Sequence, residues 1–138
     1  MTAVGSPPAT DAGRAFWLEV LAAGGSTVLP RWASAPVSGT AELEVPVPGA
    51  VQARLRRLAD GLAVPLDSVL LSAHAVVLAA LTGERDVVCG YVADDGGRPL
   101  PCRLSVDADT WRALVRRTAA VEAGLLAHRH EPVDELRA

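Results

Sequence analysis

The sequence LDSVLLSAHAVVLAALTGERDVVCGY, residues 66–91, marks the centre of the predicted fold. Residues 66–81 form an apolar run that begins after Pro65 and stops at Thr82-Gly83, which are common start and end signals of a helix. Because the helix is apolar on nearly every side, we expect it to lie centrally in the protein. The run approaches the length of a membrane span, but polar residues within it favour a helix buried in protein. These residues are Asp67, Ser68, Ser72 and His74.

The residues after this helix predict a β-hairpin. Strand-like runs at 86–93 and 99–106 flank the sequence DDGG at 94–97, and an Asp-Gly pair between such runs is a strong hairpin signal. With that Asp-Gly pair as the tight turn, Cys89 faces Cys102. A register shifted by two residues would keep the same faces but separate the cysteines, so both registers stay open. Neither Lys-Ser/Thr nor a helix follows DDGG, which indicates a turn and not a metal or phosphate loop.

Residues 48–62 predict an amphipathic surface helix. Pro48 suits the first turn, and apolar residues follow at spacings of three and four. Upstream of it, residues 41–47 alternate between apolar and polar side chains, which is the pattern of a half-buried strand. Residues 26–40 have no usable period and predict an irregular crossing segment with Trp32 as a candidate anchor.

The two ends of the chain each predict a further helix. Residues 14–23 cluster their apolar side chains on one side, and Gly24-Gly25 would end that helix. At the other end, Asp109 is the expected N-cap of a helix over residues 110–128. The inner face of that helix would carry Trp111, Leu114, Val115, Val121 and Leu125. The order of elements predicts the α+β class, with helices packed on one side of a small mixed β-sheet.

Length and composition indicate one compact domain with a core. The chain has 138 residues, half of them apolar, and a formal net charge of −3. Its 13 basic residues are scattered among 16 acidic ones without an aromatic platform, so no nucleic-acid partner is expected. Residues 1–13 lack the pattern of a signal peptide and predict a flexible lead-in to a domain over residues 14–138. No membrane association is expected, and a cytoplasmic location is the default.

A search for catalytic groups finds no residue that we assign to catalysis, cofactor binding or metal binding. His74 lies within the most apolar helix and is interpreted as a core histidine bonded to a neighbour. His128 and His130 lie at the end of the last helix, where a cation is favoured, and no third metal ligand is near them. Cys89 and Cys102 lack redox or zinc spacing and are expected to be buried reduced thiols, with a cross-strand disulfide as the alternative.

Arg54, Arg56 and Arg57 are interpreted as a solvated helix face, with an acidic partner such as a carrier protein as the alternative. A homodimer is also left open.

Five segments, taken in order, resemble the condensation domains of nonribosomal peptide synthetases. FWLEVL at 16–21, followed by Leu29-Pro30, resembles the family's YWxxxL…LP passage into the second lobe. Residues 69–78 are similar to the long core helix. The remaining matches are DVVCG at 86–90 to the DVVVG strand, RPLPCRL at 98–104 to VNTLPLR, and HRHEPVDEL at 128–136 to HQDLPFEKL.

The chain also departs from this family in ways that bear on activity. The catalytic HHxxxDG motif of the first lobe is absent, as is the FGWG bridge of the second lobe. The GFFVNT stretch is reduced to a turn, the Asn of VNT has no counterpart, and PFE is replaced at residues 132–134. The resemblance therefore implies part of the second lobe of a chloramphenicol-acetyltransferase-like, CoA-dependent-acyltransferase-like fold. No catalytic residue of the family can be placed on this chain.

The resemblance implies three roles within a synthetase. The first is a non-catalytic structural or interaction platform, ahead of an adenylation domain and in contact with other synthetase domains or a carrier protein. The alternative is half of a split condensation enzyme that needs a separate lobe carrying HHxxxDG to form amide bonds. An evolutionary remnant without a role is the third. A small-molecule binding protein outside the family ranks last, because no cluster of convergent polar groups is seen.

Overall fold

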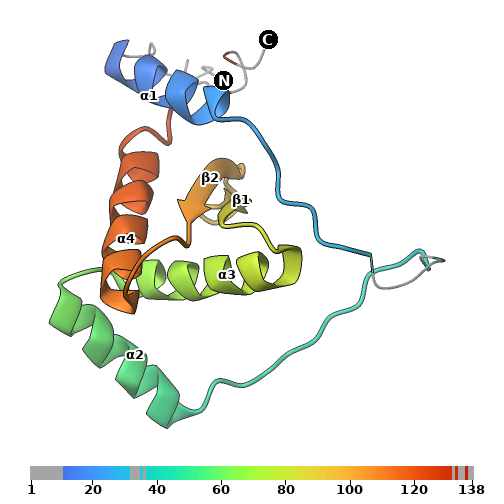
Figure 1. Cartoon of the computed structure of the whole chain (residues 1–138), viewed down its shortest axis with the longest axis vertical. Helices are drawn as coiled ribbons and strands as arrows, with labels where there is room; N and C mark the ends of the chain where they lie inside the picture. Colours follow the sequence, from blue (N-terminus) through green and yellow to red (C-terminus); the bar gives the residue numbers. More distant parts are fainter. Residues whose placement is uncertain (1–10, 32–34, 36, 132, 134–135, 137–138) are drawn as a thin grey trace, which may run out of the picture.

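The computed structural model confirms the α+β class (Figure 1). It describes residues 11–31, 35, 37–131, 133 and 136. In chain order the elements are α1 (Asp11–Ala22), α2 (Gly49–Leu62), α3 (Leu66–Thr82), β1 (Asp86–Tyr91), β2 (Leu100–Ser105) and α4 (Trp111–Ala127). The helices predicted at both ends and in the centre of the chain are therefore all present.

The predicted hairpin forms in the predicted register. β1 pairs antiparallel with β2, and Cys89 lies opposite Cys102. The turn is closed by the backbone N–H of Gly97, which donates to the carbonyl of Asp94 at 2.8 Å. Gly96 has a φ of 74°, a left-handed conformation that glycine adopts without steric cost. The DDGG sequence therefore acts as a turn, as the sequence indicates.

The core lies between the hairpin and the helices. α3 contacts β1 and α4 contacts β2, and Val87, Cys102 and Leu104 are almost completely buried between them. Trp17 of α1 is also fully buried in this core. Its indole N–H donates to the carbonyl of His128 at 2.9 Å, which fastens the first helix to the end of the last one. A smaller cluster joins α2, α3 and α4.

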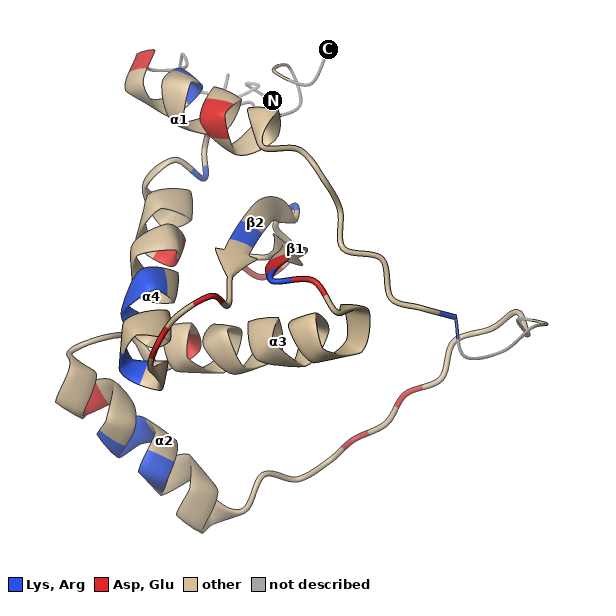
Figure 2. Cartoon of the chain, in the orientation of Figure 1, with Lys and Arg blue, Asp and Glu red and all other residues tan. Residues whose placement is uncertain are grey.

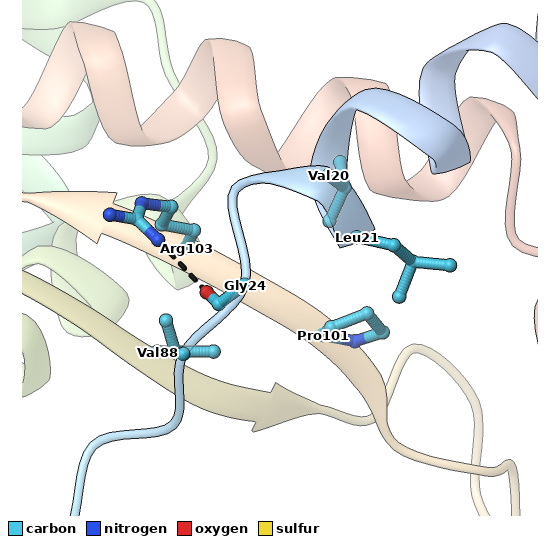
Figure 3. A pocket seen from close by; sticks show the side chains of 7 residues that line it. Val20, Leu21, Gly24, Val88, Pro101 and Arg103 are labelled. Carbon is cyan, nitrogen blue, oxygen red and sulfur yellow. Dashed lines mark hydrogen bonds between the residues drawn. The ribbon is translucent and has the colours of Figure 1, made fainter. Parts of the chain in front are cut away.

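The opposite face of the hairpin meets the chain that leaves α1. Successive strand residues point to opposite faces, so Val88 and Arg103 face away from the core. The guanidinium of Arg103 donates to the carbonyls of Ala23 and Gly24, both at 3.0 Å (Figure 3). The N–H of Val88 donates to the hydroxyl of Thr27 at 2.8 Å. The segment after α1 therefore crosses the outer face and satisfies one edge group of β1.

The prediction of a strand at residues 41–47 is wrong. These residues are exposed and extended, and they pair with no strand in the described part of the chain. An isolated alternating segment cannot form a ladder, because its backbone groups need a neighbouring strand edge. Among the described residues the sheet is the antiparallel β1–β2 pair alone, which is smaller than the mixed sheet expected. Trp32 and residues 1–10 lie outside the described residues.

Three expectations about the long helices also need correction. The N-cap of α4 is Thr110 and not Asp109, because the Thr110 hydroxyl accepts from the N–H of Ala113 at 3.1 Å. Trp111 was expected on the inner face, yet it is 58% exposed at the first position of the helix. His74 is exposed on α3 and is not a core histidine. α3 therefore buries only one side and leaves the other uncovered.

Membrane-span length was also tested on the described residues. None of the helices there is both long and apolar enough to cross a membrane by itself. α2 and α3 meet the length and composition criteria only as a pair, and this pair is bent by 109°.

Candidate functional site

Exposed apolar side chains concentrate in two neighbouring parts of the molecule. The first is the extended segment of residues 41–47, which we call the strap. Its apolar residues are Leu43, Val45 and Val47. The second is the uncovered side of α3, which we call the α3 stripe. Its residues Leu70, Val77 and Leu81 are between 39% and 55% exposed.

The strap has the side-chain pattern of a strand without a partner. Leu43, Val45 and Val47 alternate with Glu42 and Glu44, so an extended backbone separates an apolar face from an acidic one. In Figure 1 the strap runs away from the hairpin before it reaches α2. Figure 2 shows acidic positions along it and basic positions along α2. Such a segment is suited to pairing with a sheet edge on another domain.

The strap and the α3 stripe meet at a shallow hollow. Val47 at the end of the strap and Leu70 of the stripe both line this hollow, which has a volume of about 330 Å³. The side chains of Leu55 and Arg56 from α2 complete its wall. The amide of Gln52 donates to the carbonyl of Val47 at 2.8 Å and holds the strap against α2. The two exposed regions therefore meet at Val47 and Leu70.

One of the three arginines of α2 lies beside this hollow. Arg54, Arg56 and Arg57 are exposed, as the sequence indicates for a solvated face. Arg56 also lines the hollow between the strap and the α3 stripe. A basic side chain at the edge of an apolar hollow favours an acidic or polar group of a partner at that edge.

A buried polar network joins α3, β1 and α4. The carboxylate of Glu122 is 3% exposed and accepts hydrogen bonds from the hydroxyls of Ser68 and Tyr91, the latter at 2.7 Å. Ser72 donates to the carbonyl of Ser68 at 2.7 Å. Burial raises the pKa of Tyr91 well above its ordinary value, and the hydrogen bond to Glu122 raises it further. Tyr91 therefore remains a neutral donor to the carboxylate.

The sequence reasoning missed this network. Glu122 lies one turn after Thr118 and one turn before Leu125, both of which are buried on the inner face of α4. The sequence signal for this network was a carboxylate at a position on the inner face of the helix. A buried carboxylate there needs hydrogen-bond donors from other elements. Two donors do come from other elements, which gives the network the character of a positioning device for α3, β1 and α4.

The histidines do not form a pair of base and nucleophile in the described part of the chain. His74 is exposed on α3 and His130 is exposed after α4. His128 caps the end of α4, and its ring lies 4.7 Å from that of Phe16, centre to centre. Acyl transfer by a side-chain nucleophile needs a base within hydrogen-bond reach. The described hydrogen bonds place no histidine beside a serine, threonine or cysteine.

The hollow at the outer face of the hairpin is a poor ligand site. Its volume is about 220 Å³, which is below the usual range of small-molecule pockets. Its charged side chain, Arg103, already donates to two backbone carbonyls, of which Figure 3 draws that of Gly24. Val20, Leu21 and Pro101 provide an apolar wall. The hollow lacks the convergent polar groups that would orient a small molecule.

The two cysteines are free thiols on facing strands. Cys102 is fully buried and Cys89 is partly exposed. The hydrogen bond from Cys102 lowers the pKa of Cys89 to about 7. The same hydrogen bond raises the pKa of Cys102, and burial raises it further. Cys89 is therefore the thiol that ionises first.

Comparison with known proteins places this geometry in context. No family model matches the chain. The AMB antimetabolite synthetase AmbE of Pseudomonas aeruginosa is 34% identical over 144 residues, which cover 94% of this chain and 7% of that protein. The chain thus spans only a small part of the length of the curated relative that it matches.

Two solved structures share the fold. One is the first condensation domain of the calcium-dependent antibiotic synthetase in complex with a substrate analogue, with a TM-score of 0.64 and 24% identity. It matches 87% of this chain and 31% of that one. A second structure of the first condensation domain of the CDA synthetase has a TM-score of 0.59 and 23% identity over similar shares. The chain therefore has the fold of part of a nonribosomal-peptide-synthetase condensation domain, and its resemblance to that family is confirmed.

Proposed function

We propose that this chain is a non-catalytic docking platform of a nonribosomal peptide synthetase, placed ahead of an adenylation domain. One observation carries the proposal: an ordered core coexists with exposed apolar side chains on the strap and on the α3 stripe, which meet at the hollow between Val47 and Leu70. An exposed apolar patch that is rimmed by polar residues commonly marks an interaction site. The partner in this proposal is the adjoining part of the synthetase.

The energetics of the strap support docking. Full burial of a Leu or Val side chain contributes about 1.5–3 kcal/mol. Leu43 and Val45 are largely exposed, so most of that contribution is still unused in the isolated chain. Pairing with a sheet edge would add hydrogen bonds to the strap backbone, and alternate side chains would be buried on one face. Strand addition is therefore the docking mode that we expect.

The experiment compares strap variants in the presence of the adjoining adenylation domain. Leu43→Asp combined with Val45→Asp should weaken binding about 100-fold, because two apolar contacts of about 1.5 kcal/mol each are lost. Binding would be measured by titration calorimetry, and product formation by the full-length synthetase would be measured in parallel. Val37→Asp is the matched control, since Val37 is 93% exposed but precedes the alternating strap.

The results of this experiment distinguish a docking platform from an evolutionary remnant without a role. Loss of binding and of product in the double variant, with Val37→Asp unaffected, supports docking through the strap. Wild-type binding and product in the double variant would count against the proposal, as would an unchanged assembly line after deletion of the whole chain. Arg54→Glu, Arg56→Glu and Arg57→Glu together test the carrier-protein alternative, since they would weaken carrier binding alone.

A second candidate is half of a split condensation enzyme. The observation that favours it is the same apolar surface, because a lobe that lacks its partner would expose the interface. This candidate predicts amide formation when the chain is mixed with a separate lobe that carries HHxxxDG. A mixture that binds but forms no amide would exclude the enzyme and leave the platform. A homodimer and a cytoplasmic location stay predictions, and light scattering of the pure chain tests the former.

A further inference from the structure

The hairpin places two thiols directly opposite one another. The register pairs Cys89 with Cys102. The N–H of Val106 donates to the carbonyl of Arg85 at 2.8 Å, whereas the N–H of Val88 leaves the ladder and donates to Thr27. Because hydrogen-bonded pairs alternate in an antiparallel ladder, Cys89 and Cys102 belong to a hydrogen-bonded pair. The Cα atoms of such a pair lie about 5.5 Å apart, which is within the range of disulfides.

The environments of the two thiols differ in a useful way. Cys102 is fully buried among core residues and is hydrogen-bonded to Cys89. Cys89 is partly exposed at the same face, so a small oxidant can reach it first. The thiolate and not the thiol is the nucleophile, and the hydrogen bond from Cys102 stabilises the Cys89 thiolate. One thiol is thus accessible and activated, while its neighbour is protected.

The charged groups around the pair lie mainly on α4. Glu122 acts on Cys102 and raises its pKa, and it is itself bonded to Ser68 and Tyr91. The negative charge of Asp67 on α3 raises the pKa of Tyr91. The charge of Glu122 disfavours a thiolate at Cys102. Cys89 therefore ionises before Cys102.

We propose that Cys89 and Cys102 are a peroxide-responsive dithiol, in which Cys89 is the attacking thiol and Cys102 the resolving one. The Cys89 thiolate attacks one oxygen of hydrogen peroxide, the O–O bond breaks, and hydroxide leaves and takes up a proton as water. Cys89 is then a sulfenic acid. As the Cys102 sulfur attacks the Cys89 sulfur, the Cys102 thiol proton passes to the departing oxygen, the S–O bond breaks, and a second water leaves. In sum, two thiols and one peroxide give one disulfide and two waters.

The disulfide would join β1 to β2 at the centre of the hairpin. This position is two residues from Tyr91 and therefore next to the network that ties the hairpin to α3 and α4. Cross-linking the strands would restrict their movement relative to each other without creating a long closed loop. The proposal does not depend on the docking role, because it concerns the hairpin and not the strap.

The test treats the pure full-length chain with hydrogen peroxide and follows its intact mass and free thiol content. We expect a loss of about two mass units, one disulfide, and the fall of free thiols from two to none, with full reversal by dithiothreitol. A non-reducing gel should show a monomer. Alkylation of Cys89 by iodoacetamide should follow a titration with a midpoint near pH 7.

Two variants assign the roles of the thiols. Cys102→Ala should stop at a sulfenic acid on Cys89, which dimedone traps, whereas Cys89→Ala should leave Cys102 unmodified at the same peroxide concentration. Circular dichroism shows whether each variant is folded, and the wild-type mass measurement is informative even if neither is. Unchanged thiols, disulfide-linked dimers alone, or oxidation of Cys89 to sulfinic acid without any disulfide would each overturn the proposal.

Discussion

The strap and strand β2 have the same alternating side-chain pattern, but the apolar residues of the strap are exposed and those of β2 are buried. In the strap, Leu43 and Val45 alternate with acidic residues and are 89% and 69% exposed. In β2, Cys102 and Leu104 occupy equivalent alternate positions and are 0% and 2% exposed. β2 lies beside β1 and under α4, whereas the strap has no neighbouring strand in the described part of the chain. The alternating sequence therefore sets which side chains share one face of the strand. Whether that face is buried depends on whether another element packs against it.

The largest expected effect tests the buried side of this comparison. Leu104→Ala should lower the free energy of unfolding by about 2–5 kcal/mol, because it leaves a cavity in a core that cannot close completely. Urea denaturation followed by circular dichroism measures the change. A loss below about 0.5 kcal/mol would mean that β2 is no better packed than the strap, and the comparison would fail.

The next prediction concerns the network that fastens the hairpin to the helices. Tyr91→Phe removes one donor from the buried Glu122 carboxylate and should destabilise the fold by about 1–3 kcal/mol near neutral pH. Thermal or urea unfolding would show it. Thr82→Val is a control for the loss of a hydroxyl, since the Thr82 hydroxyl bonds only within and after its own helix.

The same tyrosine predicts a pH dependence. The pKa of Tyr91 is raised in the folded protein above the ordinary value of 10.0, so the folded state holds the proton more tightly than the unfolded state. This contribution is fully present below pH 10 and is lost as the pH rises further, because the unfolded state then gains by releasing the proton. Stability measured from pH 8 to 11 should therefore fall more steeply in the wild type than in Tyr91→Phe. The same dependence of stability on pH in both proteins would contradict the hydrogen bond between Tyr91 and Glu122.

A smaller effect is expected at the start of α4. Thr110→Ala should cost about 1 kcal/mol, because the first turn of the helix loses its side-chain cap. Asp109→Ala is the matched control and should change stability by less than about 0.5 kcal/mol. Urea unfolding of both variants separates the two residues. A larger loss at Asp109 would restore the cap that the sequence indicates.

The smallest effect sharpens the exposed side of the comparison. Leu43→Ser and Val45→Ser should each change the stability of the isolated chain by less than about 0.5 kcal/mol, since neither side chain is packed. The measurement is the same urea titration as for Leu104→Ala. Destabilisation by more than about 1 kcal/mol would show that the strap is buried in solution, for example against a second copy of the chain.

Local signals predicted most of the secondary structure. The proline starts of α2 and α3, the glycine end of α3 and the Asp-Gly turn act through the backbone of neighbouring residues, so they do not depend on distant contacts. The turn left two registers open, and the structure has the one in which Cys89 lies opposite Cys102. The candidate site was less accessible. Glu122 has partners 54 and 31 residues away in sequence, and no local pattern identifies them.

The sequence by itself determined which segments form the helices, where the hairpin turn lies, and the order of motifs that resembles condensation domains. The tertiary structure alone decided which apolar faces are covered. His74 is exposed although its neighbours in sequence are apolar, and Trp111 is exposed although its spacing places it on the apolar face of its helix. The strap is open although its pattern is that of a strand. The physical reason is range: turns and caps are satisfied within a few residues, whereas burial needs a partner surface that the chain must bring from elsewhere.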